Sequence, residues 1–546
     1  MKAKGRGREA TGRMRVGMAK VKSLELRPIA PGRWPLAFWA RPFPLSLYPP
    51  FSLTAVSDRA PSLIFHPLSF CLMLIAFCLL LSACRVGPEY TRPPAAAPTA
   101  FKELPPDNSP QASEWKTALP SDAMARGKWW EVYNDPELNI LEEQVSISNQ
   151  NIKAAEAQFR EAKFAVRIAR SNLYPVVSAA PSIINSRSAV TGTSGMTYDL
   201  PVDVSYQVDL WGSIRRSILA SAEAAQVSDA QLENAGLSYQ AELAQDYFEL
   251  RGTDGQKELL ETTVKSYEDY VKLTQDRFNS GVASGSDVAQ AQTQLSTARA
   301  QLIDYGVARA QFEHAIAVLT GKPPADLSIS YSPIKITPPP VPVGVPSALL
   351  ERRPDIAAAE RQMAEANEQI GIAQAAYYPT LSLSASAGLE STLFLRWINW
   401  PSRFWSVGPQ LAETIYDAGR RRATVNQSLA AYDATVANYR QTVLTAFQQV
   451  EDNLAALRVL EDEAQAESEA VKAAQNSLDI STYQYKAGTV NYLTVITEQA
   501  ILLQDQVQAV NILTRRMSAS VLLIEALGGG WNTSKLPTVA DVKSGK

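Results

Sequence analysis

The sequence is poor in cysteine and histidine, the residues that build most disulfides and metal sites. It has three cysteines and two histidines in 546 residues. Two of the cysteines lie inside an apolar run that ends at the third, Cys84, so a chain processed at that point can form no internal disulfide. His314, in "AQFEHAIAVL", has no partner at ligand spacing, which favours a packing or surface role over metal binding or catalysis.

Catalytic signatures are missing as well. The chain contains no G-x-S-x-G, G-x-x-x-x-G-K-[ST], G-x-G-x-x-G or H-E-x-x-H motif. Carboxylate pairs such as Glu142 and Glu143 are adjacent, so on a helix they point about 100° apart and do not converge on one substrate. We therefore predict neither enzyme activity nor a metal site.

An apolar run from Leu68 to Ala83 has the length of a signal-peptide core and is shorter than the ~20 residues of a membrane-spanning helix. The run ends in "LSAC", which resembles a bacterial lipobox, so Cys84 is the predicted lipidation site. A short buried helix with an incidental cysteine is the alternative, but the charged, Pro-rich sequence that follows favours export. That sequence, "RVGPEYTRPPAAAP", is typical of a tether leading away from a membrane.

The export signal sets residues 1–83 aside. Residues 1–60 hold twelve Lys and Arg against three Asp and Glu without apolar periodicity, which indicates a gene-model artefact; a basic arm for nucleic acid is the alternative. From Cys84 onward, 463 residues carry 40 Lys and Arg against 52 Asp and Glu. This acidic balance argues against a nucleic-acid partner.

The exported chain consists of two related halves. "NIKAAEAQ" at 151–158 recurs as "DIAAAERQ" at 355–362, an offset of 204 residues. Farther along, the offset becomes 207, as for the glycines at 281 and 488. The second half therefore gains three residues in between, in a segment predicted to form a strand pair. Repeats of this length indicate a duplicated half-protein rather than a solenoid.

Two tracts, 202–322 and 410–535, lack proline and are rich in helix-forming residues. Each is predicted to form two long helices that meet at a glycine-containing turn, 281–285 or 487–492. A single helix from 213 to 279 would be about 100 Å long, too long for a compact globule. Coiled-coil spacing within it predicts a buried seam of Leu260, Val264, Tyr267, Val271, Thr274 and Phe278.

Alternating residues lie before the predicted long helices of each half. "VDVSYQVDLWG" places apolar side chains from Val202 to Leu210 on one face, and "TLSLSASAGL" at 380–389 alternates likewise, so we predict two strand pairs per chain. Since four strands cannot close a membrane barrel, several chains must contribute strands. An aromatic cluster at the second turn fits either a membrane-interface girdle or a small soluble core: Phe394, Trp397, Trp400, Phe404 and Trp405.

Six motifs, in order, resemble the outer membrane efflux protein family, the TolC-like channels, and especially its NodT-type lipoprotein branch. They are "LSACRVGPEYTRP", "WWEVYNDPELNILEEQ", "ARSNLYP", "VDLWGSIRR", "RFNSGVASGSDV" and "YKAGTVNYLTV". The resemblance covers Cys84 to Trp531. It implies a mainly α fold with β, in which long coiled-coil helices and two transmembrane β-hairpins per chain form a trimeric α-barrel/β-barrel duct.

The same resemblance implies the function. The homotrimer would be the exit duct of a tripartite efflux pump, lipid-anchored in the bacterial outer membrane and extending into the periplasm. It would conduct drugs or other toxic small molecules passively, without a cofactor. Its partners would be a periplasmic adaptor (membrane fusion) protein and an inner-membrane transporter of the resistance-nodulation-division (RND) type.

By this resemblance the turns at Gly281 and Gly488 form a periplasmic tip, which closes at rest and contacts the adaptor. Family members often carry acidic residues after the second turn, where this sequence has Thr494 and Thr497. Whether an acidic residue of the first repeat takes over that role is left open. The candidates for polar links in the tip are Arg277, Asp287 and Tyr485.

The predicted organisation is an extension and signal peptide (1–83), a lipidated Pro-rich leader (84–125), a first repeat (126–322), a Pro-rich linker (323–346), a second repeat (347–530) and a tail (531–546). Each repeat holds a helix, a β-hairpin and a long helical hairpin. An adaptor-type lipoprotein should have one helical hairpin between β domains, and an envelope hydrolase should have a nucleophile and a base. A structural coiled-coil lipoprotein without a pore is distinguished only by the strand pairs.

Overall fold

The computed structural model describes residues 85–94, 98, 100–104, 127–187, 189, 192–341, 349–531 and 533–544. All of them belong to the second of the two units of the chain, Pro67–Lys546. The predicted extension and signal peptide, and the predicted lipidation site Cys84, lie outside the described residues. Of the helices described, none is apolar over a stretch long enough to cross a membrane.

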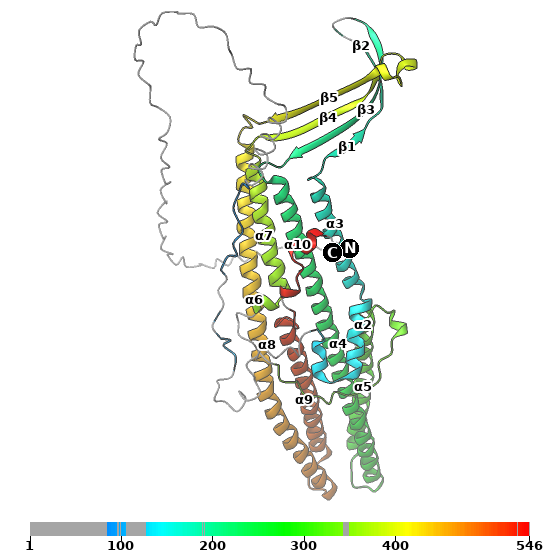
Figure 1. Ribbon diagram of the computed structural model, residues 1–546. Helices are drawn as coiled ribbons and strands as arrows, with labels where there is room; N and C mark the ends of the chain where they lie inside the picture. Colours follow the sequence, from blue (N-terminus) through cyan, green and yellow to red (C-terminus); the bar gives the residue numbers. More distant parts are fainter. Residues whose placement is uncertain are drawn as a thin grey trace, which may run out of the picture. The chain divides into compact units, whose positions relative to one another are not determined.

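The two halves share an order of elements (Figure 1). The first contains α2 (Pro136–Ser148), α3 (Gln150–Ser171), β1 (Val176–Ala179), β2 (Ser182–Arg187), β3 (Ser194–Val208), α4 (Ser213–Asn279) and α5 (Gly285–Leu319). The second contains α6 (Leu349–Arg352), α7 (Pro354–Ala375), β4 (Thr380–Ser391), β5 (Arg403–Ala412), α8 (Arg420–Ala487), α9 (Tyr492–Ala526) and α10 (Val539–Ser544). Short 3-10 helices occupy Trp129–Tyr133, Pro324–Asp326, Phe394–Arg396, Trp400–Ser402 and Thr533–Lys535.

Helix lengths confirm the internal repeat. α3 and α7 each have 22 residues, and α5 and α9 each have 35. The helix predicted from 213 to 279 is confirmed as α4, with 67 residues, and its counterpart α8 has 68. At ~1.5 Å per residue, both are about 100 Å long.

The strands form one antiparallel sheet in the order β1-β3-β4-β5, and β2 pairs with β3 beyond β1. The two predicted strand pairs are thus joined through β3 and β4. The break between β1 and β2 falls at Pro181, whose nitrogen cannot donate a hydrogen bond. Leu210 was predicted to lie in the strand, but β3 ends at Val208, because the next carboxylate, Asp209, accepts from the backbone N–H of Arg215 (3.0 Å) at the start of α4.

Strand pairing places the three extra residues of the second half within its hairpin. Val176 of β1 lies opposite Ser205 of β3, whereas Thr380 of β4 lies opposite Ala412 of β5. The first partners differ by the offset 204 and the second partners by 207. The predicted gain inside the strand pair is therefore confirmed.

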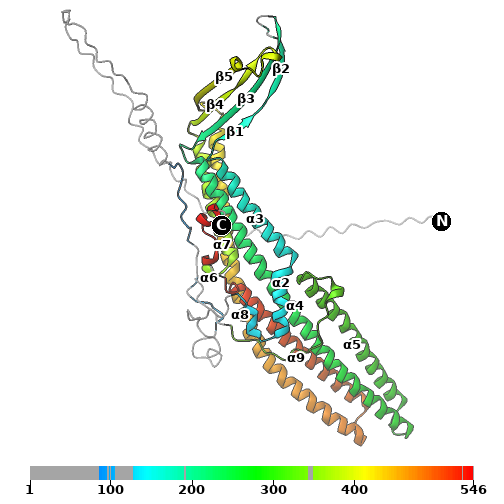
Figure 2. The ribbon, with the colours of Figure 1, turned by 45° about the vertical axis from the view of Figure 1, so that its right-hand side comes forward.

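The sheet lies at one end of the long helices and the two helix turns lie at the other (Figures 1 and 2). The seam predicted in α4 is buried at Leu260, Val264, Tyr267 and Thr274. Its last member, Phe278, is 45% exposed because α4 ends one residue later, which corrects the prediction there. Trp400, in the 3-10 helix before β5, and Trp405 of β5 are each 77% exposed, which favours a membrane-interface girdle over a soluble core.

Candidate functional site at the helix turns

The two turns predicted to form the tip have the same backbone design. Gly281 follows α4 with φ +74°, and Gly488 follows α8 with φ +79°, so both are left-handed. A Cβ at either position would meet no atom within 4 Å. The backbone angle, rather than crowding, therefore requires glycine.

Each turn leads into a capped helix. The Ser284 hydroxyl accepts from the backbone N–H of Asp287 (3.3 Å), and the Asn491 side chain accepts from that of Thr494 (3.2 Å), so Asp287 and Thr494 are equivalent. Their side chains are also engaged locally, with Asp287 Oδ1 accepting from Ser284 (2.9 Å) and Thr494 donating to Asn491 (3.0 Å). Thr497 donates to a backbone carbonyl one turn earlier (3.0 Å). The patterns S-x-x-D and N-x-x-T are the sequence signal for these caps.

Arg277 and Tyr485 lie together, although one is in the last turn of α4 and the other in the last turn of α8. The Arg277 guanidinium carbon is 4.8 Å from the centroid of the Tyr485 ring. Arg277 Nη1 also donates to the carbonyl of Lys486 (3.0 Å). These contacts link the two helical hairpins, and a cation–π contact of this kind contributes ~0.5–2 kcal/mol.

Tyr485 belongs to a small core that the sequence did not reveal. Its ring lies 5.2 Å from that of Tyr492, which is 1% exposed at the start of α9. The hydroxyls of Tyr270 and Thr482 are 2.8 Å apart and form a second link between α4 and α8. Burial raises the pKa of the Tyr485 hydroxyl and the charge of Asp287 raises it further, so Asp287 lies near this core.

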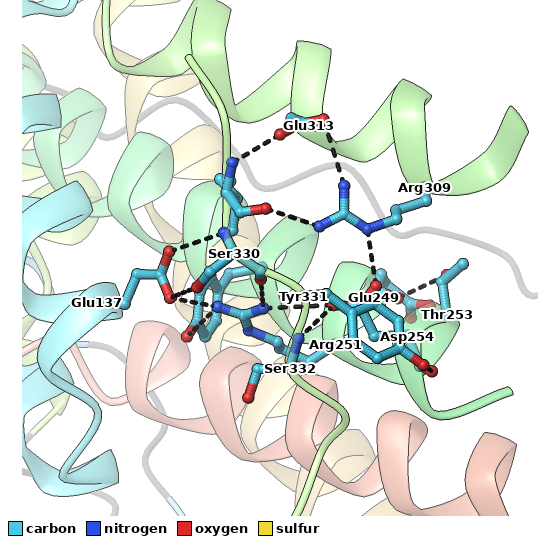
Figure 3. A network of polar contacts seen from close by, with 12 residues as sticks. Glu137, Glu249, Arg251, Thr253, Asp254, Arg309, Glu313, Ser330, Tyr331 and Ser332 are labelled. Carbon is cyan, nitrogen blue, oxygen red and sulfur yellow. Dashed lines mark hydrogen bonds and ion pairs between the residues drawn. The ribbon is translucent and has the colours of Figure 1, made fainter. Parts of the chain in front are cut away.

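A second cluster of charges lies halfway along α4 (Figure 3). Arg251 is 4% exposed, and it donates to Glu137 of α2 (2.6 Å) and to the carbonyl of Ser330 (2.5 Å). Asp254 is fully buried and accepts from Arg251 (3.3 Å) and from Arg309 of α5 (2.8 Å). In the sequence these residues have the spacing of an ordinary solvated helix face, so nothing there predicts the cluster.

These charges hold the linker between the two halves. Arg309 donates to the carbonyl of Ile329 (2.7 Å), and Glu313 accepts from the backbone N–H of the same residue (2.6 Å). Asp254 accepts from the backbone N–H of Ser332 (3.0 Å). The segment predicted as a Pro-rich linker is therefore bound to α4 and α5 where it crosses them.

Comparisons with known proteins agree with one another. The family model described as "Outer membrane efflux protein" matches residues 141–322 and 345–529. The probable efflux pump outer membrane protein TtgC of Pseudomonas putida is 32% identical over 473 residues, which cover 84% of this chain and 95% of TtgC. The pyoverdine export outer membrane protein OpmQ of Pseudomonas aeruginosa is 30% identical, covering 85% of this chain and 98% of OpmQ.

Solved structures share the fold. The outer-membrane channel OprN superposes with a TM-score of 0.75 at 27% identity, covering 82% of this chain and 100% of OprN. The CmeC outer membrane channel of Campylobacter jejuni superposes with a TM-score of 0.76 at 22% identity, covering 85% of this chain and 98% of CmeC.

Proposed function

The chain belongs to the outer membrane efflux protein family, and from this premise we propose that three copies of it form the exit duct of a tripartite efflux pump. The protein is an outer-membrane efflux channel that extends into the periplasm. A periplasmic adaptor and an inner-membrane transporter of the RND type complete the pump. The alternative, an adaptor-type or structural lipoprotein without a pore, is not favoured, because the matching proteins are channels.

The observation that supports assembly of several copies is a sheet whose two edges, β1 with β2 on one side and β5 on the other, have no partner strand among the described residues. Unpaired backbone groups in lipid cost several kcal/mol each, so the edges of neighbouring copies pair. The internal repeat indicates how. Within one chain, β3 pairs with β4 and so joins the two halves. In the repeat, β5 is the counterpart of β3, and β1 with β2 is the counterpart of β4. We therefore expect β5 of one copy to pair with β1 and β2 of the next, as β3 pairs with β4.

The repeat also gives the register between copies. Asp199 of β3 lies opposite Glu390 of β4. Shifted by the two offsets, 207 and 204, this pair becomes Ser406 of β5 and Ser186 of the partner subunit. The register keeps the apolar faces continuous, because Val407 then points to the same side of the sheet as Ile183 of the partner subunit.

The helices support the same arrangement. Phe164 and Ile168 of α3 are 56% and 70% exposed and line an open groove on that helix. The α7 counterpart of Phe164 is Glu368, which is 7% exposed and packs against α4. In the trimer, α8 of a neighbouring copy covers Phe164 as α4 covers Glu368.

Cysteine cross-linking tests the trimer and its register together. In the S406C/S186C variant, oxidation should join copies into covalent trimers, because directly opposed strand residues have Cβ atoms ~4.5–5.5 Å apart. S406C/S182C is the matched control, since four residues along a strand move the partner by ~13 Å. Monomers in both variants, or equal cross-linking in both, would contradict the proposal.

We propose further that the tip is the gate. Its links are a cation–π contact and a few hydrogen bonds, so an adaptor that binds the open arrangement more tightly by about 5 kcal/mol can open it almost fully. The turns at Gly281 and Gly488 are the proposed adaptor contacts. The proposed gate residues are Arg277, Asp287 and Tyr485, with Thr494 and Thr497 in the places that are acidic in many relatives.

We infer that the cargo is drugs or other toxic small molecules, since the relatives are named for efflux pumps and one for pyoverdine export. Deleting the gene should lower the inhibitory concentrations of several unrelated drugs and solvents, and unchanged values would contradict this inference. We also propose that Cys84 is lipidated. Mass spectrometry of the mature N-terminus should find an acylated cysteine followed by Arg85.

A further inference from the structure

The residues after Cys84 do not form the free tether that their composition predicts. The leader segment 85–90 lies in the joint between α4 and α7, where the two halves of the chain meet. Here the backbone N–H of Val86 donates to the carbonyl of Trp211 (3.2 Å), just before α4 begins. The main chain of the leader is thus hydrogen-bonded to the rest of the fold from its second described residue.

A buried ion pair connects α4 and α7 beneath the leader. Arg216 of α4 is 0% exposed, and its Nη1 donates to Glu368 of α7 (2.8 Å). Its other two nitrogens bind the leader. Nε donates to the carbonyl of Val86 (2.6 Å), and Nη2 donates to the carbonyl of Pro88 (3.1 Å). Arg85 adds a second donor to Glu368 (2.6 Å). Removing the leader would strip a buried guanidinium of two acceptors, which is costly.

The joint is also shaped for the leader. Gly87 has φ +108°, and a Cβ there would lie 2.6 Å from the Cα of Gly371 on α7. A Cβ on Gly371 would lie 2.3 Å from Nε of Arg216. Two glycines from distant segments therefore let the leader backbone approach α7 and let Arg216 reach its carbonyls. Shape and buried charge together make this a binding site.

The joint lies where the helices meet the sheet. Trp211 is three positions beyond Val208, the last residue of β3. Its indole nitrogen donates to the carbonyl of Pro379 (2.7 Å), directly before β4, and its ring stacks on Tyr378 at 4.7 Å. Trp and Tyr side chains are enriched at membrane interfaces, which supports placing the leader near the membrane face.

The corresponding joint between neighbouring copies lacks these features. By the offsets of the repeat, Arg216 corresponds to Ala423 of α8 and Glu368 to Phe164 of α3. An alanine and a phenylalanine offer no partner to main-chain carbonyls. Each chain therefore has one place for a leader, within its own two halves.

We propose that the α4–α7 joint is a dedicated binding site for the segment that follows the lipidated cysteine, and that it holds the lipid anchor at the membrane end of the helices. This inference rests on the proposed lipidation of Cys84. Because Arg85 is tied to α4 and α7 rather than to a free tether, the anchor restrains both halves of the chain at once.

Trypsin can test the site, because cleavage after Arg85 releases the acylated end. In the purified wild-type protein the bound leader should protect the Arg85–Val86 bond. The G371A variant, whose methyl group displaces Arg216, should raise the cleavage rate at this bond at least about tenfold by favouring local opening. The matched control is G306A, a helical glycine with no atom within 4 Å of its Cβ position, and it should leave the rate unchanged.

A second variant, G87A, opens the site from the leader side and leaves α7 untouched. It should expose the same bond while the helical circular dichroism and the oligomer mass stay unchanged. Equal protection in wild type, G371A and G87A would overturn the binding site. A protected leader that begins with an unmodified Cys84 would overturn the anchoring role, whereas the oligomer mass and the S406C/S186C cross-link report separately on the duct.

Discussion

The two halves of the chain place similar charges in different surroundings. In the first half, Arg309 lies 2.8 Å from Asp254, whose side chain is 0% exposed. In the second half, Arg516 lies 3.1 Å from Glu461, whose side chain is 50% exposed. The offset of 207 relates these pairs, and it relates Arg251 to Arg458. One network is buried and the other is solvated, although the repeat preserves their charges.

The difference comes from the chain that follows each helical hairpin. After α5, the linker returns across α4 and covers the first network from Ile329 to Ser332. After α9, the chain instead continues into the tail, where the carbonyl of Pro537 accepts from Gln226 of α4 (2.6 Å). The leader covers the second network only in part, with Glu103 paired to Arg458 (2.6 Å). The segment that covers an ion pair, rather than the pair itself, therefore determines how much the pair contributes to the free energy of unfolding.

Matched substitutions in the two networks should differ most in their effect on the free energy of unfolding. D254N removes the charge of a fully buried carboxylate that Arg251 and Arg309 share, and we expect a loss of ~3–5 kcal/mol in the free energy of unfolding. E461Q, the matched change in the second half, should cost about 1 kcal/mol or less, because its carboxylate is half exposed. Thermal unfolding of the purified variants, followed by circular dichroism, measures both. Equal losses would mean that the linker does not determine the difference.

Glu142 is a buried carboxyl group that, unlike Asp254, has no hydrogen-bond partner among the described residues. It lies in α2 and is 0% exposed. Burial raises its pKa well above the ordinary 4.5. The stability that this group contributes is therefore complete below pH 4.5 and is lost as the pH rises toward the pKa of the folded state.

The variant E142Q cannot ionise, so its melting temperature should exceed that of the wild type near neutral pH, and the gain should vanish in acid below the ordinary pKa. E143Q is the control, because Glu143 is half exposed and paired with Lys128, and it should give no such pH-dependent gain. Melting curves recorded across this pH range decide. A gain for E142Q that is independent of pH would show that ionisation of Glu142 is not its cause.

Much of the fold could be predicted because its signals are local. Proline-free tracts and left-handed glycines such as Gly281 and Gly488 bound the helices, and period-two alternation marks the strands. The buried network could not be predicted, because Arg251 and Asp254 have the spacing of a solvated helix face. They are buried only because the linker covers them. The leader was misread for the same reason, since its composition is that of a tether and its partner, Arg216, lies 130 residues away.

The tip could be predicted only in part. Arg277, Asp287 and Tyr485 were selected by resemblance, and they lie close together. Tyr492 and the link between Tyr270 and Thr482 were missed, because tyrosines at seam positions look like ordinary packing. Pairing across two hairpins depends on how the hairpins dock, and no spacing within either one encodes it.

The two repeats also differ at the tip, since Tyr485 is 3% exposed whereas its counterpart Phe278 is 45% exposed. Arg277 covers the tyrosine, so R277Q should loosen the proposed gate by ~1–2 kcal/mol, a factor of about 5–30 in the open fraction. Channel conductance in planar bilayers and sensitivity of cells to vancomycin should both rise. The variant K272Q removes an exposed charge from the same helix and should change neither.

The smallest effect should come from the pair of capped positions, Asp287 and Thr494. D287N removes a negative charge from the first turn of α5, where it interacts favourably with the helix dipole by ~0.3–1 kcal/mol. The same charge lies near Tyr485, on which Arg277 stacks, so its loss should loosen the proposed gate and raise conductance, by about two- to fivefold for a shift of ~0.3–1 kcal/mol between the closed and open arrangements. D276N removes an exposed charge from the last turn of α4 and serves as the control. If D287N left both conductance and vancomycin sensitivity unchanged, Asp287 would be a helix cap only, and the closed state would depend on Arg277 and the tyrosines.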